Sequence, residues 1–166
     1  MSPLEFLWVR LNTWAFQVFL AIMGVLRPLG RYLKGHPRAE RVADRVVGLP
    51  EEVFKKVAYN CQMCGQCILH STGMTCSMNC PKNLRNGPCG GVRPNGHCEV
   101  KPEMTCVWVL AYRRSFATAW ADHMHHINPP VNRRLAGTSS WINLLTETDI
   151  QTQPAWQVEG SGNGHV

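Results

Sequence analysis

The chain has 166 residues and a net charge of +6, and all of its eight cysteines lie within one segment of the sequence. This length suffices for one ordinary domain, or for a small metal module with helical extensions. The basic residues are scattered rather than grouped in blocks, so the charge does not indicate a nucleic-acid-binding protein. The sequence shows no G-x-G-x-x-G element and no convincing nucleophile–base or carboxylate pair, so no catalytic residue is predicted.

Residues 4–26 form a strongly apolar segment, which predicts a helix that Pro28 ends or kinks. Only sixteen residues separate Arg10 from Arg27. As a helix they would reach about 24 Å, less than a hydrocarbon core about 30 Å thick. Polar residues also recur here at three- and four-residue spacing. We therefore expect this helix to pack against the body of the protein or a partner, and a membrane location is disfavoured.

The next segment, residues 31–49, carries a weak helical pattern that Gly48 interrupts. A new helix is predicted from Pro50, because proline suits the first turn of a helix. Glu51 and Glu52 follow it and would lie beside the positive end of the helix dipole. This helix leads the chain into the cysteine segment.

A further helix is predicted over residues 104–127, after Pro102 and Glu103 and before a pair of prolines. Cys106 would then lie one turn inside a helix, which is a rigid position for a metal ligand. A short helix is also predicted around residues 141–145, within the motif RRLAGTSSWINLL.

The predicted fold class is mainly α, with a loop-rich, metal-stapled cysteine module and little regular strand. We divide the chain into an N-terminal apolar helix and linker (1–49), a cysteine-rich metal-binding domain with flanking helices (50–128), and a C-terminal docking motif with a flexible tail (129–166). The tail, residues 151–166, is polar and rich in glycine.

The cellular compartment decides between disulfides and metal ligation for the cysteines. The first charged residue is Glu5, and no small-residue cleavage site follows the apolar segment, so no secretory signal is predicted. The protein is expected to be cytoplasmic, where thiols stay reduced. Metal–thiolate chemistry is therefore favoured over a disulfide framework.

The cysteine segment opens with a C-x2-C-x2-C triplet. Three thiolates at this spacing are typical of iron–sulfur proteins, whereas structural zinc usually takes two cysteines from each of two short motifs. Eight residues later comes C-x3-C-P, the ending of the bacterial ferredoxin motif. We predict that all of the cysteines are metal ligands: Cys61, Cys64, Cys67, Cys76, Cys80, Cys89, Cys98 and Cys106.

The distribution of these ligands stays open at this stage. They can hold two [4Fe-4S] clusters, one cluster with a zinc ion at a second site, or one cluster with spare thiols. The triplet is expected to share one centre, with Cys80 or Cys106 as its fourth ligand. The second centre would then form around Cys76, Cys89 and Cys98. The two histidines of the segment are interpreted as solvated loop residues.

The string CPKNLRNGPCGGV, followed by GHCEV and then CVW, resembles the methylenetetrahydrofolate reductase C-terminal-like domain family. The motif RRLAGTSSWINLL resembles the closing motif of that family, and the resemblance covers roughly residues 50–147. It implies a small zinc or iron–sulfur subunit that accompanies a flavin-containing methylenetetrahydrofolate reductase. In such a pair, FAD is bound only by the TIM-barrel partner, which reduces methylenetetrahydrofolate to methyltetrahydrofolate.

Three functions follow from these observations. The first is a non-catalytic iron–sulfur subunit that passes electrons between an electron-donor protein and the FAD of the partner. The second is a structural zinc or iron–sulfur module that stabilises or assembles the flavoprotein. The third, a zinc module for nucleic acid, is the weakest, because no basic helix with interleaved aromatic residues accompanies the cysteines.

Overall fold

The computed structural model describes residues 1–149, which are mainly helical around a long loop-rich segment. The α-helices of this part are α1 (Pro3–Val25), α2 (Arg27–Lys34), α3 (Pro37–Tyr59), α4 (Val107–Ser115) and α5 (Ser140–Leu145). Short 3-10 helices lie between them: η1 (Leu69–Thr72), η2 (Ser77–Asn79), η3 (Ala121–His125) and η4 (Arg133–Leu135). One isolated antiparallel bridge, between His97 and Thr105, is the strand-like pairing of the described residues. The predicted mainly α fold class is thus confirmed.

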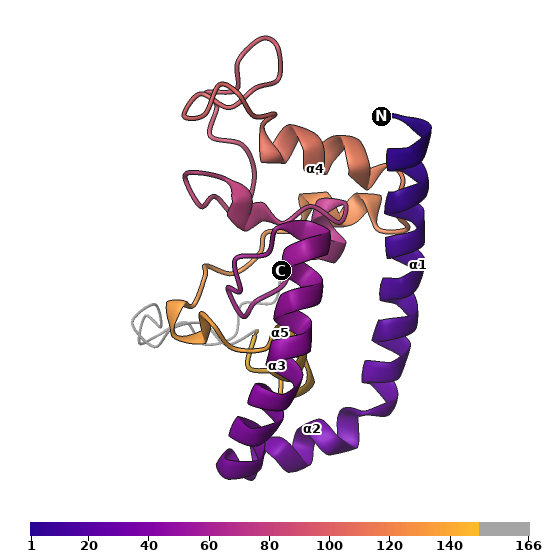
Figure 1. The fold of residues 1–166 in the computed structure, drawn as a ribbon, viewed down its shortest axis with the longest axis vertical. Coiled ribbons are helices and arrows are strands. Elements are labelled where there is room, and N and C mark those ends of the chain that lie inside the picture. Colours follow the sequence, from indigo (N-terminus) through magenta and orange to yellow (C-terminus); the bar gives the residue numbers. More distant parts are fainter. Residues whose placement is uncertain (150–166) are drawn as a thin grey trace, which may run out of the picture.

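The first three helices form a U, in which α1 and α3 run antiparallel and α2 joins their ends (Figure 1). The loops that precede α4 project from the U at the end where α3 finishes (Figure 1). The predicted tail over residues 151–166 lies outside the described residues, and the division into three parts stays a prediction. The short helix predicted around residues 141–145 is confirmed as α5.

The N-terminal helix was predicted correctly in its extent. The Ser2 side chain caps α1 by accepting a hydrogen bond from the Glu5 backbone N–H at 3.1 Å. The helix ends at Val25, and Pro28 falls in the first turn of α2, where proline costs no hydrogen bond. By length and composition α1 could cross a membrane, which is weak evidence on its own.

One face of α1 packs against the body of the protein. Val9 and Thr13 are buried there, and the Thr13 hydroxyl donates to the Val9 carbonyl at 2.8 Å. Phe16 packs edge-on against Trp120, and Phe19 packs against Trp141 of α5. Of the polar residues that recur along this helix, Thr13 therefore points inward, whereas Arg10 and Gln17 are exposed.

The opposite face of α1 is exposed and apolar. Its residues follow the alternating three- and four-residue spacing of a coiled-coil seam: Leu4, Leu7, Leu11, Trp14, Val18, Ala21 and Val25. We call these residues the outer face of α1. Within the described residues nothing covers it, so the expected burial of this helix on most of its circumference is not provided by this chain.

Helix α3 is continuous over 23 residues, so the predicted break at Gly48 and new start at Pro50 are wrong. The helix is held by contacts with the segment that leads into α5: the Asp44 carboxylate accepts a hydrogen bond from the Ser139 N–H at 2.7 Å. Gly48 lies on the same face, where an added Cβ would stand 3.8 Å from the Ser139 Cβ. Pro50 is exposed, so water can bond to the carbonyl that proline leaves unpaired.

Helix α4 starts three residues later than predicted and ends twelve residues earlier. The late start has its cause in a backbone pairing across the preceding loop. The Cys98 N–H donates to the Met104 carbonyl at 3.0 Å, and the Cys106 N–H donates to the Gly96 carbonyl at 2.9 Å. This pairing draws the residues before Val107 out of the helix. Cys106 is therefore the N-cap of α4 rather than a residue inside it.

Candidate metal centres

The cysteines divide into two groups of four, and each group lines its own pocket. The first cysteine pocket is lined by Cys61, Cys64, Cys67 and Cys76, and the second cysteine pocket by Cys80, Cys89, Cys98 and Cys106. All eight are free thiols. The triplet is thus brought together as predicted, but Cys76 accompanies it where Cys80 or Cys106 was expected.

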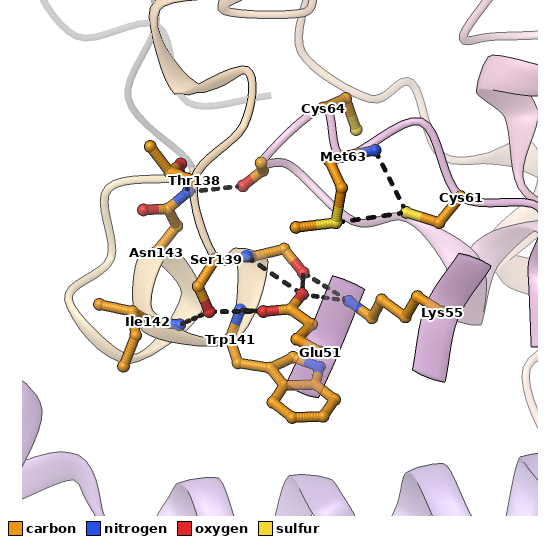
Figure 2. Close-up of polar contacts among 12 residues, drawn as sticks. Glu51, Lys55, Cys61, Met63, Cys64, Thr138, Ser139, Trp141, Ile142 and Asn143 are labelled. Carbon is orange, nitrogen blue, oxygen red and sulfur yellow. Dashed lines mark hydrogen bonds and ion pairs between the residues drawn. The ribbon is translucent and has the colours of Figure 1, made fainter. Parts of the chain in front are cut away.

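The triplet loop is shaped by the C-terminal part of the described chain. Met63 and Gly65 adopt left-handed backbone angles, with φ of 45° and 75°. A Cβ on Gly65 would lie 2.2 Å from the Leu135 carbonyl oxygen, so this close approach requires glycine. The Asn143 side-chain amide donates to the Gly65 carbonyl at 2.9 Å (Figure 2). The Gly137 N–H donates to the Met63 carbonyl at 2.8 Å. Residues far along the chain therefore fix the positions of the first three cysteines.

The thiols of the first pocket interact with one another. Cys61 donates a hydrogen bond to Cys76, which raises the pKa of Cys61 and lowers that of Cys76. The Cys61 sulfur also accepts a hydrogen bond from the Met63 N–H at 3.3 Å (Figure 2). Burial raises the pKa of Cys64, and the positive charge of Arg85 opposes that effect. Cys76 is accordingly the sulfur that deprotonates most readily of these three.

Arg85 contributes a buried cation to the same pocket. Its side chain is only 7% exposed and lines the pocket beside the thiols. Its Nη2 donates a hydrogen bond to the Gln66 carbonyl at 2.9 Å. The Gln66 side chain is anchored in turn: it accepts a hydrogen bond from the Asn132 N–H at 2.6 Å and donates one to the Asp149 carbonyl at 2.6 Å. Nε and Nη1 of Arg85 have no hydrogen-bond partner within residues 1–149.

A second buried cation reaches the pocket from α3 and is held by Glu51. The Glu51 carboxylate is fully buried and accepts hydrogen bonds from Lys55 Nζ at 2.7 Å and from the hydroxyls of Ser139 and Ser140 (Figure 2). The backbone N–H groups of Ser140 and Trp141 also donate to it, at 3.2 and 3.4 Å. Glu51 therefore caps the N-terminus of α5 across the fold, instead of the start of its own helix.

Lys55 stays positively charged despite its burial. Burial favours the neutral amine, but Cys67, when ionised, and the Glu51 carboxylate outweigh this and raise the pKa of Lys55. Burial, together with Cys67 when it is ionised, also raises the pKa of Tyr59 to about 12. The first cysteine pocket is consequently bordered by two buried cations, of which Lys55 is paired with Glu51 and Arg85 has no carboxylate partner among the described residues.

The second cysteine pocket is closer to solvent. Cys80 and Cys106 are buried in it, whereas Cys89 is exposed and donates a hydrogen bond to the Glu99 carboxylate at 3.1 Å. Glu99 is also paired with Lys82 at the surface. Trp108 lines the pocket at 5% exposure, and its indole N–H has no hydrogen-bond partner among the described residues.

One short turn connects the two pockets. Cys76 precedes η2 and Cys80 follows it, so consecutive cysteines of the sequence belong to different pockets. The Asn79 side chain fastens this turn to the end of α3 by donating to the Tyr59 carbonyl at 3.0 Å. In bacterial two-cluster ferredoxins the cysteine before proline likewise ligates the other cluster. Cys80, which precedes Pro81, correspondingly lines the pocket that the triplet does not enter.

The donor sets fit metal–thiolate clusters. Each pocket offers four sulfur ligands, and each has a buried N–H donor, on Arg85 or Trp108, that lacks an acceptor among the described residues. Inorganic sulfide and thiolate sulfur would supply such acceptors. Within residues 1–149, no group of three or more Cys, His, Asp or Glu side chains is arranged so that it could hold a metal ion.

The histidines of the segment line neither cysteine pocket. His70 stacks on Phe16 and lies edge-on to His123, and His97 Nδ1 lies 2.7 Å from the Pro102 carbonyl oxygen. The residues that sequence reasoning missed are the buried charged and polar groups around the first pocket: Glu51, Lys55, Gln66 and Arg85. Arg85 lies inside the string that carries the family resemblance, but no local pattern marks it as buried.

Residues 41–134 match the family model described as methylene-tetrahydrofolate reductase C terminal. The chain belongs to this family. The match spans more than half of the chain and includes every cysteine of both pockets. It ends before α5, so most of the segment that resembles the closing motif lies beyond it. No curated protein and no solved structure matches the chain.

Proposed function

We propose that this member of the methylene-tetrahydrofolate reductase C-terminal family is an iron–sulfur accessory subunit of a methylenetetrahydrofolate reductase complex. It passes electrons between a one-electron donor protein and the FAD of a flavoprotein partner. The observation that carries this proposal is the division of the cysteines into two four-sulfur pockets joined by one turn. Two adjoining four-sulfur sites would place two redox centres side by side, which suits a relay.

When bound, each [4Fe-4S] cluster would supply a one-electron redox couple, held by the four cysteines of its pocket. Once it had received two such electrons and two protons, the FAD of the partner would be able to reduce methylenetetrahydrofolate to methyltetrahydrofolate. This subunit supplies no hydride chemistry of its own, because its sequence carries no nucleotide fingerprint or acid–base pair. It works in the cytoplasm, where reduced thiols are available for ligation.

The outer face of α1 is the docking surface for the flavoprotein in this proposal. Its apolar side chains repeat with the spacing of a helix-packing seam, and an exposed apolar patch of this kind marks an interface. Leu11→Glu combined with Val18→Glu should abolish co-purification with the flavoprotein, since each charge would be buried without a partner. Arg31→Glu, on the exposed surface of α2, is the matched control and should leave co-purification intact.

Membrane attachment of α1 is the outcome that would contradict this docking role. If the wild-type chain remains in the membrane fraction after carbonate extraction while the flavoprotein is present, α1 serves as an anchor instead of an interface.

The two half-reactions of the complex test the electron-transfer role. In complexes that carry Cys67→Ser or Cys98→Ser, reduction of the flavin by the donor should slow, while oxidation of the reduced flavin by methylenetetrahydrofolate should keep its wild-type rate. Each variant interrupts one of the two pockets, and the flavoprotein itself is unchanged. Full activity of the flavoprotein without this subunit would contradict the proposal.

A structural role is the second candidate, and the composition of the interior favours it. Buried polar and charged side chains are at least as numerous as buried apolar ones among the described residues, so metal bonds would replace a hydrophobic core. An equal loss of both half-reactions in the cysteine variants would support this reading. A zinc ion in the second pocket is the corresponding cofactor alternative, which a count of iron, sulfide and zinc in anaerobically purified protein decides.

A further inference from the structure

We propose that Arg85 is a positioning residue that donates hydrogen bonds to the sulfur atoms of the centre in the first cysteine pocket and raises its reduction potential. This inference rests on the proposed function and names a residue outside the predicted ligand set. It starts from a buried guanidinium group with two unused donors beside four thiols.

Burial makes the charge of Arg85 costly unless an anion lies nearby. No carboxylate forms an ion pair with Arg85 among the described residues, and a carbonyl at 2.9 Å occupies only one of its three nitrogen atoms. Lys55, the other buried cation of this pocket, differs in this respect, because Glu51 and Ser140 take up its ammonium group at 2.7 and 2.6 Å. Arg85 is therefore the cation whose binding capacity remains for the contents of the pocket.

The position of Arg85 is fixed rather than adjustable. The carbonyl that it binds belongs to Gln66, which lies inside the triplet between Cys64 and Cys67 and is 1% exposed. Because the Gln66 side chain is itself anchored to Asn132 and Asp149, the guanidinium group is held against the loop that carries the thiols. Guanidinium also keeps its charge at any ordinary pH.

The effect on potential follows from charge. One-electron reduction adds a negative charge to a centre that four thiolates already make anionic, and a buried cation stabilises the reduced form more than the oxidised form. Hydrogen bonds to cluster sulfur act in the same direction. Removal of Arg85 should therefore shift the potential of this centre to more negative values and leave the centre in the second pocket unaffected.

The test uses the full-length subunit, purified anaerobically, as wild type, Arg85→Gln, Arg85→Lys and the control Arg45→Gln. Arg45 is exposed on α3, at a position that precedes the pocket-lining residues of that helix. Iron and sulfide are counted in each protein, and the midpoint potentials are measured by a reductive titration followed by electron paramagnetic resonance. Arg85→Gln should disfavour reduction of one centre about tenfold, a shift of about 59 mV. The midpoint potential of this centre in Arg85→Lys should lie between those of the wild type and Arg85→Gln. The potentials of Arg45→Gln should match those of the wild type.

The outcomes separate the two proposals. Wild-type protein without iron and sulfide overturns the proposed function and this inference with it. If the wild type and Arg85→Gln both contain iron and sulfide and their midpoint potentials are the same, only the inference is overturned. Loss of iron from both Arg85→Gln and Arg85→Lys also overturns it, because Arg85 would then be needed to build the pocket and not to set its potential.

Discussion

At the scale of single residues, two neighbouring ion pairs on α3 differ mainly in burial. Glu51–Lys55 has side chains 0% and 5% exposed, whereas Glu52–Lys56 has side chains 36% and 57% exposed. Both pairs have the same residue types and the same spacing. They therefore form a matched comparison for the energetic role of the buried carboxylate.

Glu51→Gln should destabilise the protein by about 3–5 kcal/mol, because it leaves the Lys55 cation buried without its counter-charge. Glu52→Gln, the matched exposed change, should cost about 1 kcal/mol or less. The measurement is the free energy of unfolding by denaturant at neutral pH, at equal metal content. Similar losses in the two variants would show that the buried pair does not hold α5 to α3.

The cysteines could be predicted from sequence because their spacing is local, whereas the groups around them could not. Glu51 binds residues that lie 88 to 90 positions later in the chain, and the sequence around it favoured a helix start instead. Arg85 carries no periodic pattern that would mark its burial. Cys76 was assigned to the other centre, since only the folded path of η2 shows which pocket each neighbouring cysteine enters.

At the scale of elements, the N-terminal half of α1 is tied to α4 by charge. The Glu5 carboxylate accepts a hydrogen bond from Arg114 Nε at 2.9 Å and lies 3.4 Å from Arg113 Nη2. Arg114 also stacks over Trp8 of α1, at 5.3 Å. Burial raises the pKa of Glu5, but the hydrogen bond and charge of Arg114 outweigh it, so that the net pKa is lowered.

The sign of this pKa shift predicts a pH window. The pKa of Glu5 in the folded protein lies below its ordinary value of 4.5. The stabilisation that Glu5 gives the folded state is therefore complete above pH 4.5 and is lost as the pH falls through the folded pKa. Glu5→Gln should therefore weaken the amide-exchange protection of α1 by the same factor at every pH from 8 to 5. The pair is partly exposed, so the factor should be modest. A difference between the variants that changes within this range would contradict the assignment.

The helices themselves were predictable to different degrees. α1 and α5 follow from local signals, namely an apolar run with a serine cap and a short motif around Trp141. α3 and α4 were mispredicted where backbone groups make contacts across the fold. Contacts with the segment before α5 hold α3 straight through Pro50, and the pairing of Cys98 with Met104 delays the start of α4. Local helix propensity does not reflect these contacts, because they join residues that are not neighbours in the sequence.

At the scale of the whole molecule, the two cysteine pockets predict a specific metal stoichiometry. Cys67→Ser and Cys98→Ser should each retain about half of the wild-type iron and sulfide if both pockets hold four-iron clusters. The measurement is a chemical assay of iron and sulfide with protein quantification, under anaerobic conditions. Complete loss of iron in one variant and none in the other would mean that one pocket holds no cluster.

The turn η2 carries a cysteine of each pocket at its two ends, so filling one pocket should affect the filling of the other. Fixing Cys76 on one side removes most of the freedom of Cys80 on the other, because only three residues separate them and Asn79 anchors the turn to α3. The ordering entropy of the turn is then lost once, with the first cluster, and not again with the second. Reconstitution of the apoprotein should accordingly be cooperative, with half-filled molecules scarce at every iron concentration.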